Sequence, residues 1–195
     1  MMNNDVIFGT VPFENVAISE REVMARIGAK ADLEDENIAR IFSKLADTAC
    51  YRYAYTRVSV CVDGNTCNLG FASVNSSSLS RVLSDSSEAF IIAVTAGLDV
   101  DRLISRAMIQ NKAEAFLIDG IASAAVESLA DHIQRKICEG IDLTKRFSPG
   151  YADFPLEFQA SLLERLNAER TLGIRLSKDL LMTPMKSITA IIGIK

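Results

Sequence analysis

Residues 89–96 form the feature that most limits how this chain can fold. The run reads AFIIAVTA, apolar at nearly every position and as long as a typical strand. A half-buried strand alternates apolar and polar residues, whereas a strand covered on both faces is apolar throughout. Gly97 follows directly and ends the run. We therefore expect a central strand that is buried on both faces.

The remaining strands are predicted from alternation and from turn residues. Residues 55–62 alternate between the two sides of a strand, and the Asp-Gly-Asn sequence at 63–65 is typical of a hairpin turn. The return strand is predicted over 67–74, and a last strand over 187–193. Residues 5–18 are predicted to be extended.

Helical periodicity and capping residues predict several shorter helices. Ser19, with Glu22 three positions later, has the pattern of a capping box, and Gly28 is placed to end that helix. Asp99 is expected to cap another helix. The predicted helical segments are 19–28, 34–49, 76–83, 100–108 and 156–171.

The longest helical segment, 111–138, has an unusually slim face. Small side chains let another group approach a helix backbone closely, and two occupants fit such a face: a second helix or a bound ligand. The face is made of Ala113, Ala115, Gly120, Ala122, Ser123, Ala124, Ala125 and Ala130.

Together these elements predict an α+β fold with a mixed, largely antiparallel sheet. The chain has 195 residues, of which 49% are hydrophobic and 24% charged, which is typical of a globular domain with a sizeable core. No linker composition or internal repeat divides the sequence, so we expect a single domain over 1–195.

Charge and hydropathy exclude several classes of partner. The net charge is −4 and no basic stripe is visible, so no nucleic-acid partner is expected. No uninterrupted apolar run approaches the ~18 residues of a membrane-spanning helix, and the first residues lack the pattern of a signal peptide. We therefore expect a cytoplasmic protein without a membrane partner.

The cysteines and the histidine give little support to metal or nucleophilic chemistry. Cys50, Cys61, Cys67 and Cys138 form no C-x-x-C pair, and we expect free thiols that lie mostly in the core. A Cys61–Cys67 disulfide across the predicted hairpin is the alternative. His132 is the only histidine, and we expect it to be a surface or half-buried helical residue. No metal site and no catalytic residue are predicted.

The strongest candidate for a binding site is the stretch RFSPGY at 146–151. Arg146 is a permanent cation whose planar fork fits a carboxylate. Pro149 makes a rigid bend, Gly150 is expected to adopt a positive φ and to allow close approach of a ligand, and Tyr151 offers a flat apolar face. The alternative is an ordinary Ser-Pro-Gly turn between two helices, with a solvated Arg146.

The hexamer matches R-x-x-x-G-Y, the S-adenosylmethionine-binding signature of the activation domain of cobalamin-dependent methionine synthase. Similar stretches occur on either side of it, at 119–127 (DGIASAAVE), 172–176 (LGIRL) and 182–184 (MTP), followed by the last strand. The resemblance covers roughly 85–194. The earlier residues resemble the small stand-alone members of the family, so the chain resembles a free-standing homologue.

The resemblance implies a binding site for S-adenosylmethionine. It assigns Arg146, Ser148, Gly150, Tyr151 and Glu127 to that site, with the Glu127 carboxylate accepting from the ligand's ammonium group. A solvated helical glutamate is the alternative for Glu127. The family also uses an aspartate near its start and a tyrosine after the last strand. Asp5 is the candidate for the aspartate, and no residue matches the tyrosine.

The resemblance also implies a function, that of an accessory module for reductive reactivation of cobalamin. The corrinoid-binding pattern D-x-H-x-x-G is absent, so cobalamin is expected only on a partner, either a methionine synthase or a related corrinoid protein. A low-potential electron donor is the other expected partner. We expect a shallow groove beside 146–151 and the small-residue face. The alternative is a non-catalytic ligand-sensing or scaffolding subunit that keeps the fold.

Overall fold

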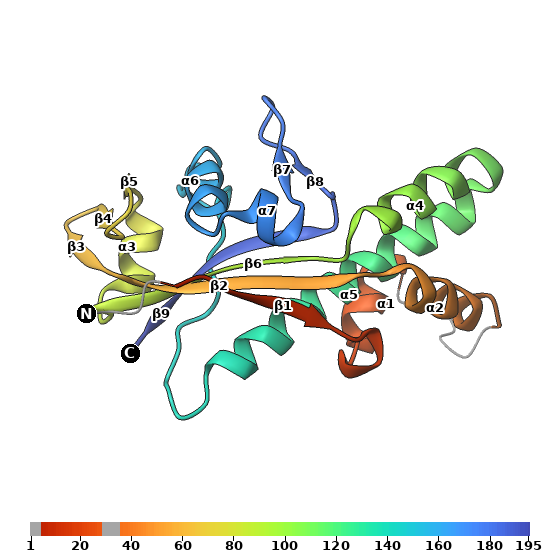
Figure 1. The fold of residues 1–195 in the computed structure, drawn as a ribbon, viewed down its shortest axis with the longest axis horizontal. Helices are drawn as coiled ribbons and strands as arrows, with labels where there is room; N and C mark the ends of the chain where they lie inside the picture. The colour runs from red at the N-terminus through yellow and green to blue at the C-terminus, as the bar shows by residue number, and fades with distance from the viewer. Residues whose placement is uncertain (1–4, 29–35) are drawn as a thin grey trace.

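The protein is built around one four-stranded sheet with helices on both faces (Figure 1). The structure is a computed structural model that describes residues 5–28 and 36–195. The strand order is β1-β2-β6-β9, and each pair of neighbours is antiparallel. The strands are β1 (Ile7–Val11), β2 (Tyr51–Ser59), β6 (Glu88–Thr95) and β9 (Ser187–Ile194).

The predicted central strand is confirmed as β6, and both of its faces are buried. Its side chains alternate between two separate hydrophobic clusters, one on each side of the sheet. Phe90, Ile92 and Val94 belong to the first cluster, and Ala89, Ile91 and Ala93 to the second. This strand is therefore the structural link between the two cores.

The first strand of the predicted hairpin is longer and more broken than its alternation indicates. β2 begins at Tyr51, before the predicted start at 55, because its first residues pair with both β1 and β6. The strand ends at Ser59, and the backbone N–H of Val60 then donates to the carbonyl of Ser87 at 2.8 Å.

The hairpin itself belongs to a second, three-stranded sheet. β3 (Cys61–Asp63) and β4 (Thr66–Asn68) form it, and Gly64 lies at its turn with φ +56°. The single return strand predicted over 67–74 is wrong. Gly70 has φ +79° and donates its N–H to the Asn68 side chain at 2.8 Å, which separates β4 from β5 (Ser73–Asn75).

The first face of the sheet is covered by helices α1, α2, α4 and α5. The predicted N-cap at Ser19 is confirmed, with its hydroxyl accepting from the Glu22 N–H at 3.3 Å, but the reciprocal half of the capping box is not formed, because the Ser19 N–H donates to the Ser128 hydroxyl. Asp99 is not a cap, because α4 begins at Leu98 and Asp99 pairs instead with Arg102 at 2.8 Å. The bounds are Glu20–Ile27 for α1, Glu36–Thr48 for α2, Leu98–Gln110 for α4 and Lys112–Ile137 for α5. The predicted start of α2 at 34 lies outside the described residues.

The slim face of α5 is occupied by protein. A Cβ atom added at Gly120 would lie 2.6 Å from Cγ2 of Ile27, so α1 crosses α5 at close range there. The Ser128 hydroxyl, also on α5, accepts from the Ser19 N–H at 3.1 Å. Of the two predicted occupants, the structure therefore contains the helix. Ala115, Ala122, Ala124, Ala125 and Ala130 are buried in the same cluster, whereas Ala113 is exposed.

Shorter helices and a small hairpin cover the second face. The single helix predicted over 156–171 is wrong, because Asn167 adopts a left-handed conformation with φ +49° and separates two helices. The helices here are α3 (Ser77–Leu83), α6 (Phe158–Arg165) and α7 (Ala168–Leu172). The hairpin is formed by β7 (Arg175–Leu176) and β8 (Met182–Thr183).

Near the N-terminus, the segment predicted to be extended over 5–18 is interrupted by a 3-10 turn, η1 (Phe13–Asn15).

The predicted α+β class is confirmed, and every described strand pairing is antiparallel. Within residues 5–28 and 36–195, no helix has both the length and the apolar character needed to cross a bilayer.

The four cysteines are free, but the expectation that they lie mostly in the core is wrong. Only Cys67 is buried, whereas Cys50 and Cys61 are exposed and Cys138 is half-buried. The alternative disulfide is absent. Cys61 pairs in register with Asn68, and Cys67 with Val62, so the two sulfur atoms do not face each other directly.

Candidate functional site

The stretch that carries Arg146 lies along the free edge of β9. Phe147 and Ile191 exchange two backbone hydrogen bonds of 2.9 Å, and Lys195 donates to the Asp142 carbonyl at 2.9 Å. The chain between 142 and 147 therefore extends the sheet edge. This pairing fixes where the following turn projects.

The turn itself is rigid. Gly150 has φ +87°, which confirms the positive φ predicted for it. Its N–H donates to the Phe154 carbonyl at 2.8 Å, and a Cβ atom at this position would lie 3.3 Å from Leu156 Cδ1. Phe154 is buried and stacks on Phe147 with 5.9 Å between ring centroids. The turn is thus anchored to the second core.

Asp153 fastens the same turn to the start of α3. Its carboxylate accepts from the hydroxyls of Ser76 (2.8 Å) and Ser77 (2.6 Å) and from the N–H groups of Ser77 (2.7 Å) and Ser78 (3.1 Å). These hydrogen bonds, that from Ser77 first, hold the pKa of Asp153 well below its usual range. Asp153 caps a helix N-terminus from a distant part of the chain.

A pocket of about 360 Å³ opens between this turn, β9 and the helices on either side. Four of the predicted site residues line it: Arg146, Ser148, Tyr151 and Glu127. Gly150 is not among the lining residues and shapes the turn behind them. The other lining residues are Phe147, Pro149, Gln159, Met182, Ser187, Ile188 and Thr189.

The groove was expected beside 146–151 and beside the small-residue face of α5, and only the first of these two positions is right. It lies beside 146–151, but α5 contributes only Glu127 to the lining, and most of the small residues of α5 are buried in the first core. Gln159, Met182 and residues 187–189 of β9 line the pocket but were not assigned to the site from the sequence. Gln159 precedes Leu162 and Leu163 by three and four positions, so a polar residue on the apolar stripe of a helix was the available signal.

Arg146 is paired with protein groups, so the alternative expectation of a solvated Arg146 is wrong. Its Nη1 lies 2.5 Å from Asp131 Oδ1 and 3.1 Å from Gln134 Oε1, and its Nη2 lies 3.3 Å from Glu127 Oε2. The side chain is 18% exposed. The Nε–H and one Nη2 hydrogen have no partner among the described residues, and these are the donors left for a further acceptor.

Glu127 links two arginines and is not a simple solvated residue. Its second carboxylate oxygen lies 3.6 Å from Arg26 of α1. The pocket wall therefore holds an anionic and a cationic group side by side, with Arg146 next to Glu127. Tyr151 stands at the rim with 65% of its surface exposed.

Other candidate residues lie elsewhere. His132 is half-buried, as predicted, and burial, followed by the charges of Arg135 and Lys136, lowers its pKa. Asp5 is exposed, and its main-chain carbonyl accepts from the Thr56 hydroxyl at 3.2 Å. Neither residue lines the pocket. In the described part of the chain, no group of three or more His, Cys, Asp or Glu residues is arranged to hold a metal.

Comparison with known proteins gives a match in structure and none in sequence. No family model and no curated protein match the chain. Among solved structures, the crystal structure of the MetH reactivation domain bound to AdoHcy superposes with a TM-score of 0.72 at 16% sequence identity. The match covers 98% of this chain and 79% of that one. The chain has the fold of the MetH reactivation domain. The fold implied by the sequence resemblance is thereby confirmed.

The reactivation-domain fold here carries a pocket suited to binding. Its polar groups are a cation, an anion and hydroxyls beside an exposed aromatic ring, and no histidine lines it. Such a set can hold and orient a zwitterionic ligand with a flat ring, because each end finds a complementary group.

Proposed function

We propose that this chain binds S-adenosylmethionine and acts as an accessory module for reductive reactivation of the cobalamin of methionine synthase or a related corrinoid protein. One observation carries the proposal. Arg146, Ser148, Tyr151 and Glu127, which the sequence signature and the resemblance single out, line a single pocket in a chain with the reactivation-domain fold.

The charges of the pocket support a ligand with an amino-acid end. An α-amino acid presents a carboxylate and an ammonium group on adjacent atoms. Arg146 and Glu127, 3.3 Å apart, offer the matching cation and anion. The unpaired donors of Arg146 would take the carboxylate, and Glu127 would accept from the ammonium.

The exposure of the pocket supports a partner-dependent role. S-adenosylmethionine supplies a methyl group on a sulfonium, and transfer requires donor and acceptor atoms within about 3–3.5 Å in line. Tyr151 and the other rim residues would orient the ligand while leaving one side open to the corrinoid protein. A low-potential electron donor completes the proposed reaction, and this chain contributes positioning.

Titration calorimetry with S-adenosylmethionine and AdoHcy tests the binding step. We expect the wild type to bind both, and Arg146→Ala to weaken binding by about 10- to 150-fold, the effect of losing a charge-assisted hydrogen-bond pair. Arg135→Ala is the matched control, because Arg135 is an exposed arginine of α5 that does not line the pocket. A wild type that binds neither compound at millimolar concentration contradicts the proposal.

A reactivation assay tests the functional step. It combines an oxidised corrinoid protein, a low-potential electron donor and S-adenosylmethionine, with and without this chain. The proposal requires methylcobalamin to form faster when the wild type is present, and the gain to be lost with Arg146→Ala. An equal rate across several corrinoid proteins contradicts the reactivation role.

The second candidate function is a non-catalytic ligand-sensing or scaffolding subunit. The observation that favours it is the pairing of Arg146 with Asp131, Gln134 and Glu127, which gives the guanidinium a structural role without any ligand. Ligand binding without any acceleration in the reactivation assay would support this candidate over the first.

A further inference from the structure

Gln159 is a buried polar residue on the wall of the pocket. It lies in the first turn of α6, is 5% exposed and lines the pocket. Its Nε2 lies 3.2 Å from the carbonyl of Leu180, in the tip of the β7–β8 hairpin. A carbonyl oxygen only accepts hydrogen bonds, so the amide nitrogen must face it. This contact fixes which way the amide is turned.

The amide oxygen of Gln159 is left to accept a hydrogen bond from the pocket. No described residue donates to Oε1. In the described chain, the fully buried side-chain oxygens that lack a hydrogen-bond partner belong to Tyr51, Ser86 and Asp101. Oε1 of Gln159 is not among these fully buried atoms. Because this oxygen has no partner among the described residues and is not fully buried, and because Gln159 lines the pocket, we take Oε1 to face the pocket.

Gln159 and Glu127 reach the pocket from opposite layers of the protein. Glu127 projects from α5, which packs in the first core, whereas α6 packs in the second. The sheet edge formed by β9 lies between them, and its residues Ser187 and Thr189 also line the pocket. A ligand whose amino-acid end lies at Arg146 and Glu127 would extend its other end toward Gln159.

We propose that Gln159 determines specificity for an aminopurine by accepting a hydrogen bond from its exocyclic amino group. This inference rests on the proposed function, in which the ligand carries adenine opposite its amino-acid end. A 6-oxopurine has an oxygen where adenine has the amino group. Two acceptors would then face each other, and a site built for a hydrogen bond rejects such an analogue.

Calorimetry with AdoHcy and its 6-oxo analogue, S-inosylhomocysteine, tests the inference on the wild type and two variants. The wild type should prefer AdoHcy by about 10-fold or more. Gln159→Met removes both polar atoms and should bring the two affinities within about 2-fold, chiefly by weakening AdoHcy. Gln159→Glu keeps an acceptor oxygen but loses the donor to Leu180, and should retain the preference.

The outcomes separate specificity from a structural role. If Gln159 only anchors the hairpin, both variants weaken the two ligands equally and the preference is unchanged, which overturns the inference. A wild type that binds both ligands with equal affinity also overturns it, and that comparison needs no variant to fold. A wild type that binds neither ligand contradicts the proposed function, and the inference fails with it.

Discussion

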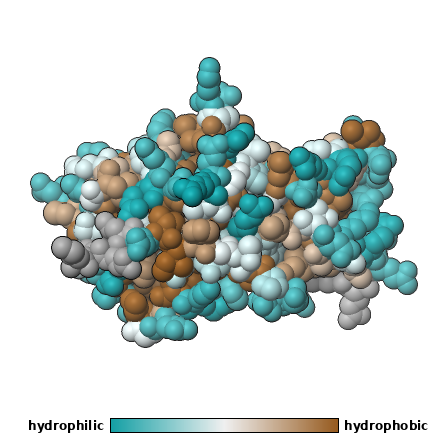
Figure 2. Space-filling model, viewed as in Figure 1, coloured by the Kyte–Doolittle hydropathy of each residue, from teal (hydrophilic) through white to brown (hydrophobic). Residues whose placement is uncertain are grey.

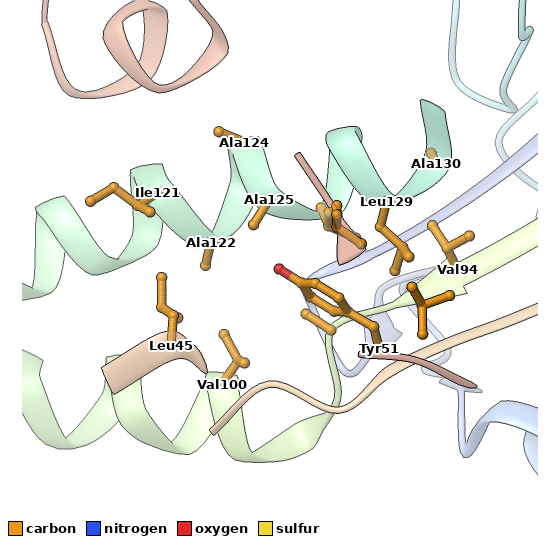
Figure 3. Packing of buried hydrophobic residues seen from close by; sticks show 14 of the residues in the cluster. Leu45, Tyr51, Val94, Val100, Ile121, Ala122, Ala124, Ala125, Leu129 and Ala130 are labelled. Carbon is orange, nitrogen blue, oxygen red and sulfur yellow. The ribbon is translucent and has the colours of Figure 1, made fainter. Parts of the chain in front are cut away.

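Tyr51 buries its hydroxyl without a hydrogen-bond partner among the described residues. The residue is 2% exposed, and Figure 3 shows its hydroxyl directed toward α5, near Ala122 and Ala125. A buried polar group without a partner destabilises the folded state by about 1–3 kcal/mol. We therefore expect Tyr51→Phe to raise the free energy of unfolding by about 1 kcal/mol at neutral pH, measured by urea denaturation. Phe13 stacks on the Tyr51 ring at 5.4 Å, a contact that phenylalanine keeps.

Tyr51→Phe should also change how the free energy of unfolding depends on pH under alkaline conditions. Burial raises the pKa of Tyr51 above its ordinary value of 10.0, so above that pH the unfolded chain loses a proton that the folded chain retains. Ionisation of Tyr51 therefore leaves the free energy of unfolding unchanged below about pH 10 and lowers it as the pH rises further. Tyr51→Phe should flatten that fall. A variant with the same alkaline loss as the wild type contradicts this account.

Asp131 is expected to weaken ligand binding, because its negative charge beside Arg146 repels the ligand carboxylate. Its side chain is 52% exposed, and an exposed ion pair contributes only about 0.2–1 kcal/mol. Asp131→Asn should therefore raise the affinity for AdoHcy by up to about 5-fold, measured by calorimetry. Asp142→Asn is the control, because Asp142 is an exposed aspartate that does not line the pocket. Unchanged affinity in Asp131→Asn would contradict this electrostatic effect.

At the scale of elements, Asp153 fixes the binding turn to α3 and makes that attachment dependent on pH. Its lowered pKa means that it stabilises the fold fully above its ordinary value of 3.8, and that the contribution is lost as the pH falls below it. Asp153→Asn should therefore be less stable than the wild type at about pH 7, and the difference should shrink at about pH 3. Denaturant titrations at the two pH values measure this.

The control for Asp153 is Asp47→Asn, which removes an exposed carboxylate from α2, far along the chain from the turn. It should show no comparable loss at neutral pH. Because the turn carries Tyr151, Asp153→Asn should also weaken AdoHcy binding. A stability difference of the same size at both pH values would mean that the carboxylate charge does not matter.

Elements with local signals were predicted well from the sequence. The apolar run of β6, the cap at Ser19 and the hairpin turn at Gly64 each depend on residues close together in the chain. Element boundaries set by distant pairing were missed. The start of β2 depends on β1 and β6, and the break at Asn167 lies inside an uninterrupted helical pattern.

The candidate site divides in the same way. Arg146, Ser148 and Tyr151 were found because a short signature contains them, and Glu127 because of the resemblance. Asp131 and Gln159 were not found. Their places beside Arg146 and in the pocket wall depend on how α5, α6 and the segment along β9 pack, and no short pattern encodes that arrangement.

At the scale of the whole molecule, a mostly polar surface (Figure 2) covers two hydrophobic cores. Figure 2 shows a mostly polar face on which apolar residues gather over the first half of β1. Ile7 and Phe8 of that edge strand are 50% and 59% exposed. The two cores behind this surface lie on opposite sides of one sheet and share β6. Neither core can unfold without exposing one face of that strand.

We therefore expect the chain to unfold in one cooperative transition. The sequence has no tryptophan, and three of its four tyrosines, Tyr51, Tyr53 and Tyr55, pack on the first core, so tyrosine fluorescence in a Tyr151→Phe background reports that side. Phe71 packs against the second core, and Phe71→Trp places a single reporter there. The tyrosine and tryptophan signals should have the same denaturation midpoint, because the cores share β6.

AdoHcy should shift both midpoints together. Its pocket takes Glu127 from the first layer and Gln159 from the second, so ligand binding requires both layers to be folded. A ligand that binds only the folded state adds about 2.7 kcal/mol of stability at about 100 times its dissociation constant. Arg146→Ala should remove most of that shift for both reporters. If ligand moves the tryptophan midpoint and not the tyrosine midpoint, the two layers unfold independently and the single-domain prediction is wrong.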